Sequence, residues 1–223
     1  MDKTLLRQAM LKFFSGVVLV ALLLFLPAGT LHFWQAWLLM GILFVPMFLA
    51  GLVMLFKSPE LLRRRLKAKE EEGEQRIVIA LSGLMFLLSF LLAGLNFRAS
   101  WLVLPRWASW AAALVFLLGY GLFAEVLREN AYLSRTVEVQ DGQKLIDSGL
   151  YGIVRHPMYS ATVLLFLAMP LVLGSPLSFA VMLLYLPIIA KRIRNEEKVL
   201  SKGLEGYRDY CQRVKYRLFP GIW

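Results

Sequence analysis

The long uncharged run near the start of the chain constrains the fold most strongly. Between Phe13 and Phe56 no residue carries a formal charge, and only the turn-like segment Pro27-Ala28-Gly29-Thr30 interrupts the apolar pattern. A helix needs about 20 apolar residues to cross a hydrocarbon core of about 30 Å. A run with room for two crossings and a turn predicts a helical hairpin in a membrane.

Three further uncharged runs extend this pattern. Residues 77–97 and 107–124 each have the length of one crossing, and residues 158–190 are divided at Gly174-Ser175-Pro176 into two arms that are short for a bilayer. Hydrophobic residues make up 59% of the chain, as expected when lipid is the solvent. We therefore expect an all-α integral membrane protein with five to six transmembrane helices, the last two forming a short helical hairpin.

The basic residues predict the orientation. The chain has a net charge of +10. If the N-terminus is cytoplasmic and six segments cross, every Lys and Arg except Arg98 and Arg106 falls on the cytoplasmic side. Both termini are then cytoplasmic, and the basic surface faces anionic lipid headgroups without a nucleic-acid partner. No Ala-x-Ala-like cleavage site follows the first segment convincingly, so we expect it to be retained rather than removed as a signal peptide.

The cytoplasmic segments divide the predicted domain into two parts. We expect a single membrane domain over residues 1–223, with four transmembrane helices in 1–127 and an interfacial helix near 58–75. Pro59, between a Ser and a Glu, is typical of a helix start. Residues 128–223 hold the motifs that carry chemistry.

Some kinds of site are disfavoured by residue counts. One cysteine excludes an internal disulfide and a multi-cysteine zinc site, and two histidines argue against a histidine-built metal centre, so no metal is expected. No Gly-x-Gly-x-x-Gly follows a predicted strand, which excludes a Rossmann-type cofactor site. The alternation in Thr136–Val139 predicts one short strand in the loop before the last helical pair.

The segment GLYGIVRHPMYSA places an Arg-His-Pro triplet where an apolar run begins. Pro157 suits the first turn of a helix, which puts His156 at the N-cap. We expect the free N–H groups of the next three residues and the Arg155 side chain to form an anion site at the membrane surface. Interfacial anchoring is the alternative interpretation of the same triplet.

Two later segments concentrate charge and aromatic rings. RIRNEEKVL carries adjacent carboxylates as its helix leaves the membrane, and we expect them to lie near the Arg-His-Pro triplet because the two helices are consecutive. An intrahelical pair between Arg192 and Glu196 on a solvated helix is the simpler alternative. GYRDYCQRVKYR interleaves tyrosines with cations, which suits a ligand that carries both charges and an aromatic base.

Together, GQKLIDSGLYGIVRHPMYSA, RIRNEEKVL and GYRDYCQRVKYRLFPGIW resemble the isoprenylcysteine carboxyl methyltransferase family and its bacterial and phospholipid-methyltransferase relatives, over residues 130–223. The resemblance implies an integral membrane methyltransferase. Its S-adenosylmethionine would lie in a cytoplasmic pocket capped by a loop and the C-terminal tail, and a lipophilic or lipidated acceptor would arrive from the bilayer. The membrane would be the inner membrane of a bacterium or the endoplasmic reticulum of a eukaryote.

The resemblance also implies site residues. It assigns cofactor binding to Tyr151, Arg155, His156, Pro157, Tyr159, Glu196, Glu197, Tyr207 and Tyr210, and catalytic roles to Arg213, Glu197 and Arg192. In the resulting hypothesis either glutamate binds the cofactor's ammonium or ribose, and either arginine orients the acceptor carboxylate. The chain departs from the family pattern at Ala161 and Leu204, where glycine is usual.

Several alternatives stay open on sequence alone. A sterol- or steroid-type reductase with NADPH carries a similar Arg-His-Pro element, and a phospholipid amine or a small thiol is an alternative methyl acceptor. A non-catalytic scaffold or small transporter is the third class. The apolar runs contain no buried charge before Glu125, which argues against a transport pathway.

Overall fold

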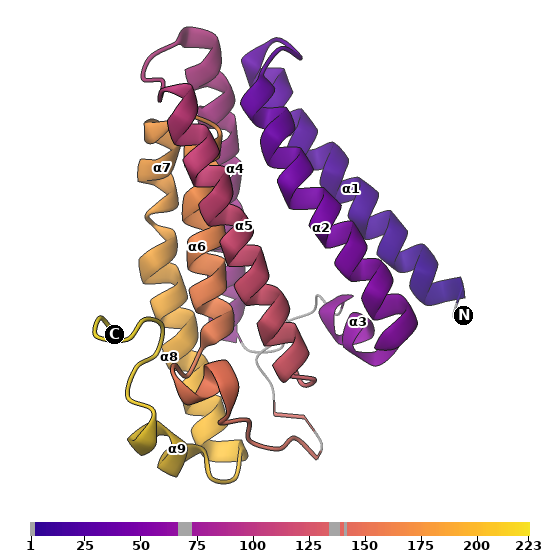
Figure 1. Cartoon of the computed structure of the whole chain (residues 1–223), viewed down its shortest axis with the longest axis vertical. Helices are drawn as coiled ribbons and strands as arrows, with labels where there is room; N and C mark the ends of the chain where they lie inside the picture. Colours follow the sequence, from indigo (N-terminus) through magenta and orange to yellow (C-terminus); the bar gives the residue numbers. More distant parts are fainter. Residues whose placement is uncertain (1–2, 67–72, 134–138, 141) are drawn as a thin grey trace.

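The computed structural model describes residues 3–66, 73–133, 139–140 and 142–223, and these contain helices and no strand. The predicted all-α fold is confirmed. Figure 1 shows the hairpin of α1 and α2 beside the group formed by α4 to α8, with α3, α9 and the segment before α6 at one end. The elements are α1 (Lys3–Ala28), α2 (Trp34–Lys57), α3 (Pro59–Leu66), α4 (Gly73–Ala99), α5 (Arg106–Glu129), the 3₁₀ helix η1 (Gly149–Gly152), α6 (Pro157–Val172), α7 (Pro176–Met182), α8 (Tyr185–Gly203) and α9 (Tyr207–Arg213).

Five segments are long and apolar enough to cross a membrane, by length and composition: α1, α2, α4 from Arg76, α5, and α7 with α8. The shorter α6 is also apolar. Large apolar side chains on the outer faces are exposed, among them Leu26, Phe56 and Leu118. Such faces suit contact with lipid, so the chain is an integral membrane protein.

The first hairpin packs against the rest of the bundle through a close helix contact. A Cβ atom at Gly94 of α4 would lie 2.7 Å from the Leu24 carbonyl oxygen and 2.9 Å from Pro27 Cβ of α1. Only a glycine allows this approach of two backbones. The hairpin turns at Gly29, whose φ is +67°, within the predicted turn.

The last apolar run turns where the sequence predicts. Gly174 has a φ of +70°, and Ser175 caps α7 by accepting the Ser178 N–H at 3.3 Å. The helix then breaks between α7 and α8, a feature that the sequence analysis missed. Pro187 has no N–H for the Leu183 carbonyl, which accepts instead from Leu186 at 3.1 Å.

The interfacial segment is described in part. The helix expected near 58–75 runs from Pro59 to Leu66, residues 67–72 lie outside the described part of the chain, and α4 begins at Gly73. Leu62 of α3 is buried in a small cluster with Leu5 and Leu55. The strand expected at 136–139 lies almost entirely outside the described residues.

Candidate active site

The Arg-His-Pro triplet begins α6. His156 is the N-cap and Pro157 occupies the first helical position, as the sequence predicts. The His156 carbonyl accepts the backbone N–H groups of Tyr159 at 3.0 Å and Ser160 at 3.2 Å. The anion site expected from free N–H groups is therefore wrong for two of its three donors, because the first turn already satisfies them.

The C-terminal tail pairs with the same segment. The Arg155 N–H donates to the Tyr216 carbonyl and the His156 N–H donates to the Arg217 carbonyl, each at 2.9 Å. Ser160 Oγ donates to the next carbonyl of the tail at 2.6 Å. These bonds hold the tail against the backbone at the start of α6.

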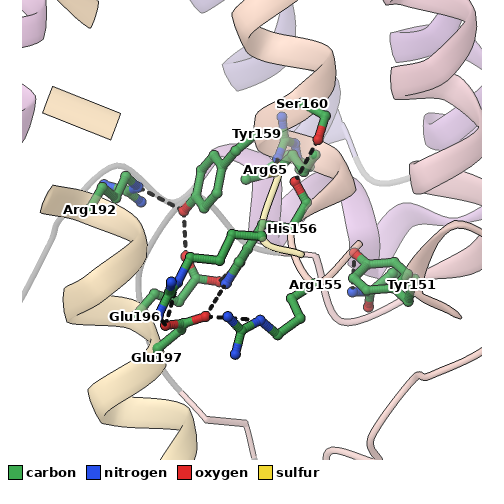
Figure 2. A network of polar contacts seen from close by, with 12 residues as sticks. Arg65, Tyr151, Arg155, His156, Tyr159, Ser160, Arg192, Glu196 and Glu197 are labelled. Carbon is green, nitrogen blue, oxygen red and sulfur yellow. Dashed lines mark hydrogen bonds and ion pairs between the residues drawn. The ribbon is translucent and has the colours of Figure 1, made fainter. Parts of the chain in front are cut away.

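Glu197 of α8 contacts basic side chains from two parts of the chain, the start of α6 and the C-terminal tail (Figure 2). Its Oε1 lies 3.3 Å from Arg155 Nε and 3.4 Å from His156 Nε2, and its Oε2 accepts Arg217 Nε at 2.9 Å. The Glu197 side chain is only 12% exposed. An ionised carboxylate so far from water needs such partners.

Glu196 has different partners. The Tyr159 hydroxyl donates to Glu196 Oε2 and accepts Arg192 Nε at 2.9 Å, so Tyr159 connects the other two side chains, as Figure 2 shows. His156 Nδ1 lies 4.0 Å from Glu196 Oε1. The phenol thus links Arg192 and Glu196, the two residues that the sequence alternative joins as an intrahelical pair.

Three tyrosines form an aromatic wall. Asn130 Nδ2 donates to the Tyr151 hydroxyl at 2.8 Å, and the Tyr210 hydroxyl donates to the Tyr151 carbonyl at 2.7 Å. Burial raises the pKa of Tyr151 to about 12 and also raises the pKa values of Tyr207 and Tyr210. All three are neutral phenols at neutral pH. The buried Tyr207 hydroxyl has no hydrogen-bond partner in the described part of the chain.

A glycine and a carboxylate set the position of Tyr151. Gly149 has a φ of +57°, and the Glu129 carboxylate occupies the space that a side chain at Gly149 would need. Glu129 also accepts the Leu150 N–H at 3.0 Å. The end of α5 thereby holds η1, the turn that carries Tyr151.

These groups surround one cavity of about 100 Å³. It lies where η1, the start of α6, α8 and α9 meet. Its lining residues are Asn130, Tyr132, Leu133, Gln143, Lys144, Leu145, Ile146, Tyr151, Arg155, His156, Met158, Tyr159, Arg192, Glu196, Leu200, Leu204, Tyr207 and Tyr210.

Three of the predicted site residues do not line the cavity. Pro157 is buried in the first turn of α6. Glu197 faces Arg155, His156 and Arg217. Arg213 Nη2 pairs with Asp147 Oδ2 at 2.7 Å, and its side chain is 63% exposed. The other eight predicted residues all line it.

The loop after α5 forms a wall of the cavity that the sequence did not predict. This wall includes Asn130, Tyr132 and Gln143, which belong to no periodic pattern. Arg217 was noted among the tail cations but not assigned to the site. Its distance along the chain from Glu197 gives no signal of their pairing.

Comparisons with known proteins agree with the motifs. Residues 111–202 match the model of the isoprenylcysteine carboxyl methyltransferase (ICMT) family. The chain also has the fold of the eukaryotic intramembrane Ras methyltransferase isoprenylcysteine carboxyl methyltransferase, with a TM-score of 0.59 and 20% identity, over 96% of this chain and 77% of that one.

Sterol reductases are also similar over part of their length. Delta(14)-sterol reductase TM7SF2 of Mus musculus is 32% identical over 40% of this chain and 22% of its own. Delta(14)-sterol reductase of Methylotuvimicrobium alcaliphilum is 24% identical over 54% of this chain and 32% of its own. The chain thus spans a third or less of the length of these relatives.

The family match covers the part of the chain that supplies α6, α8 and most of the polar cavity wall. The fold likeness covers nearly all of the chain, whereas the reductase matches are confined to a part of much longer proteins. On these grounds the chain is similar to the isoprenylcysteine carboxyl methyltransferase family over residues 111–202 and has the fold of the Ras methyltransferase structure.

Proposed function

We propose that the chain is an S-adenosylmethionine-dependent methyltransferase whose acceptor is the carboxylate of an isoprenylcysteine-like lipid. The observation that supports this most is the presence of Glu196 and Arg192 on the wall of one cavity at the end of apolar helices. They offer an acidic contact for a cationic ligand and a basic contact for an anionic one.

The residues of the cavity suit the cofactor. Its ammonium group would lie against Glu196, and its adenine against the tyrosine wall. The Tyr207 hydroxyl, buried and without a described partner, is available to hydrogen-bond a ligand in the cavity. When bound, S-adenosylmethionine supplies an electrophilic methyl group.

The acceptor requires positioning rather than proton transfer. A carboxylate is already ionised at neutral pH, so the protein has to align it and exclude water. We assign its orientation to Arg192 rather than Arg213, since Arg192 lines the cavity and Arg213 pairs with the exposed Asp147. Without a guanidinium, a carboxylate at the edge of the bilayer would be poorly stabilised.

We also propose that the site faces the cytoplasm. The basic bias of the segments at this end supports that orientation. The membrane would be the inner membrane in a bacterium or the endoplasmic reticulum in a eukaryote. The acceptor's hydrocarbon chain would reach the site from the lipid around the helices.

Methyl transfer from a radiolabelled donor by the purified full chain tests the proposal. An N-acetylated farnesyl-cysteine with a free carboxylate should take up label, and the corresponding carboxamide should not. Label on the carboxamide, on a phospholipid amine or on a small thiol, with none on the free carboxylate, would contradict the assigned acceptor. Absence of transfer to any of them, or to a lipid extract, would contradict the activity.

A further inference from the structure

Glu196 and Glu197 are adjacent, yet they have separate surroundings. Successive residues on an α-helix point about 100° apart, so two neighbouring side chains cannot share one face. Glu196 lines the cavity, whereas Glu197 is turned toward the start of α6 and the C-terminal tail. If Glu197 affects cofactor binding, it must therefore do so through residues that line the cavity.

Arg217 is the contact of Glu197 on the tail side. Its Nε and Nη2 both lie 2.9 Å from Glu197 Oε2. The guanidinium also lies over the Trp223 ring, 5.1 Å from the ring centroid. The Arg217 backbone N–H donates to the Trp223 carbonyl at 2.8 Å, and its own carbonyl accepts the His156 N–H. Both the backbone and the side chain of Arg217 are thus fixed.

The other oxygen of Glu197 faces two residues that line the cavity. Arg155 Nε and His156 Nε2 lie 3.3 and 3.4 Å from Oε1. The Arg155 side chain is 8% exposed and that of His156 is 4% exposed. With little water to replace a lost partner, the direction of the Glu197 carboxylate determines where both side chains are held.

We infer that Arg217 is a positioning residue, which acts through Glu197 to hold Arg155 and His156 at the cavity wall. The link between the tail and the imidazole is independent of what the cavity binds. Its effect on cofactor affinity rests on the proposed function. Two measurements distinguish the structural link from its effect on cofactor affinity.

The imidazole itself reports the link. The chain has two histidines, so ring-labelled histidine gives two imidazole signals in an NMR spectrum, and a His32→Gln variant assigns them. We expect Arg217→Ala to shift the His156 signal and leave that of His32 in place. Arg217→Lys, which keeps the charge, should restore most of the wild-type position. Lys215→Ala removes an exposed cation from the same tail and is the matched control.

An unchanged His156 signal in Arg217→Ala, or a shift of equal size in Lys215→Ala, would overturn the inference whether or not a cofactor binds. If the signal moves as expected while the wild type binds no S-adenosylhomocysteine, the link holds and the proposed function fails. Comparison of Arg217→Lys with the wild type also separates loss of charge from unfolding.

Affinity for S-adenosylhomocysteine gives the second readout. We expect Arg217→Ala to raise its Kd about tenfold, as the loss of a charge-assisted hydrogen bond can do. The acceptor KM should change less, since Arg192 is held by Tyr159 rather than by Glu197. In a Glu197→Gln background, Arg217→Ala should add little, because both changes interrupt one contact. Fully additive effects on Kd, or a wild-type Kd in Arg217→Ala, would contradict the inference.

Discussion

At the residue scale, the site divides charge between two carboxylates with different tasks. Glu196 lies on the cavity wall, joined to Arg192 through the Tyr159 hydroxyl. Glu197 contacts Arg155, His156 and Arg217. The phenol contacts both the guanidinium of Arg192 and the carboxylate of Glu196. Both charged side chains line the cavity.

Glu196→Gln tests the acidic contact. The change keeps the shape of the side chain but removes the charge that a cofactor ammonium would meet, so we expect the Kd for S-adenosylhomocysteine to rise at least about tenfold. Glu205→Gln removes an exposed carboxylate just beyond α8 and should leave the Kd unchanged. Calorimetry on the purified chain makes the measurement, and equal affinities for the two variants would contradict the role of Glu196.

Arg192→Lys tests the basic contact. Lysine keeps the charge but loses the planar donors that match a carboxylate, so we expect the acceptor KM to rise severalfold more than the cofactor Kd. The same substitution at Arg213 should have a smaller effect on acceptor KM, because that guanidinium is paired outside the cavity. A larger effect at Arg213 would reverse the assignment. Steady-state kinetics with varied acceptor gives both values.

At the element scale, two glycines hold helices and turns in place. Gly94 lets α4 approach the backbone of α1, and Gly149 leaves room for the Glu129 carboxylate beside η1. Neither requirement comes from helix propensity. Each arises because another segment occupies the space of the missing side chain.

Gly94→Ala should separate α1 from α4. Its new methyl group would clash with backbone, so we expect a loss of about 1–3 kcal/mol in the free energy of unfolding. Gly83→Ala, on the same helix with no atom within 4 Å, is the control and should be neutral or stabilising. Thermal unfolding in detergent compares them. An unchanged melting temperature for Gly94→Ala would mean that the two helices do not pack this closely.

Gly149→Ala should disturb the turn that carries Tyr151. A positive φ costs about 1–2 kcal/mol for an L-residue, and displacement of Glu129 adds to this cost. Gly142→Ala introduces a similar backbone strain, since its φ is +69°, but meets no atom within 4 Å. We expect Gly149→Ala to lower the melting temperature and cofactor affinity more than Gly142→Ala does. Equal effects would assign the whole loss to strain and none to Glu129.

At the scale of the whole molecule, most of the architecture could be predicted from the sequence. Uncharged runs give the spanning helices, and Pro157 and Gly174-Ser175-Pro176 give the limits of α6. The break before α8 was missed, although Pro187 explains it. Apolar content alone does not show whether a proline within a long run breaks the helix.

Only part of the site could be predicted from the sequence, because the orientation and pairing of its residues depend on packing. The motifs identify the residue types, but the choice between Glu196 and Glu197 depends on how α8 is rotated in the bundle. The pairing of Arg217 with Glu197 depends on the path of the tail. Both are set by packing between distant segments, which spacing along the chain does not encode.

The most direct test of the central claim compares two ligands on the purified full chain. S-adenosylhomocysteine should bind saturably at one site per chain and raise the melting temperature, and NADPH at the same concentration should not. Stabilisation by NADPH without any by S-adenosylhomocysteine would contradict the claim and favour the chemistry of the sterol reductases instead.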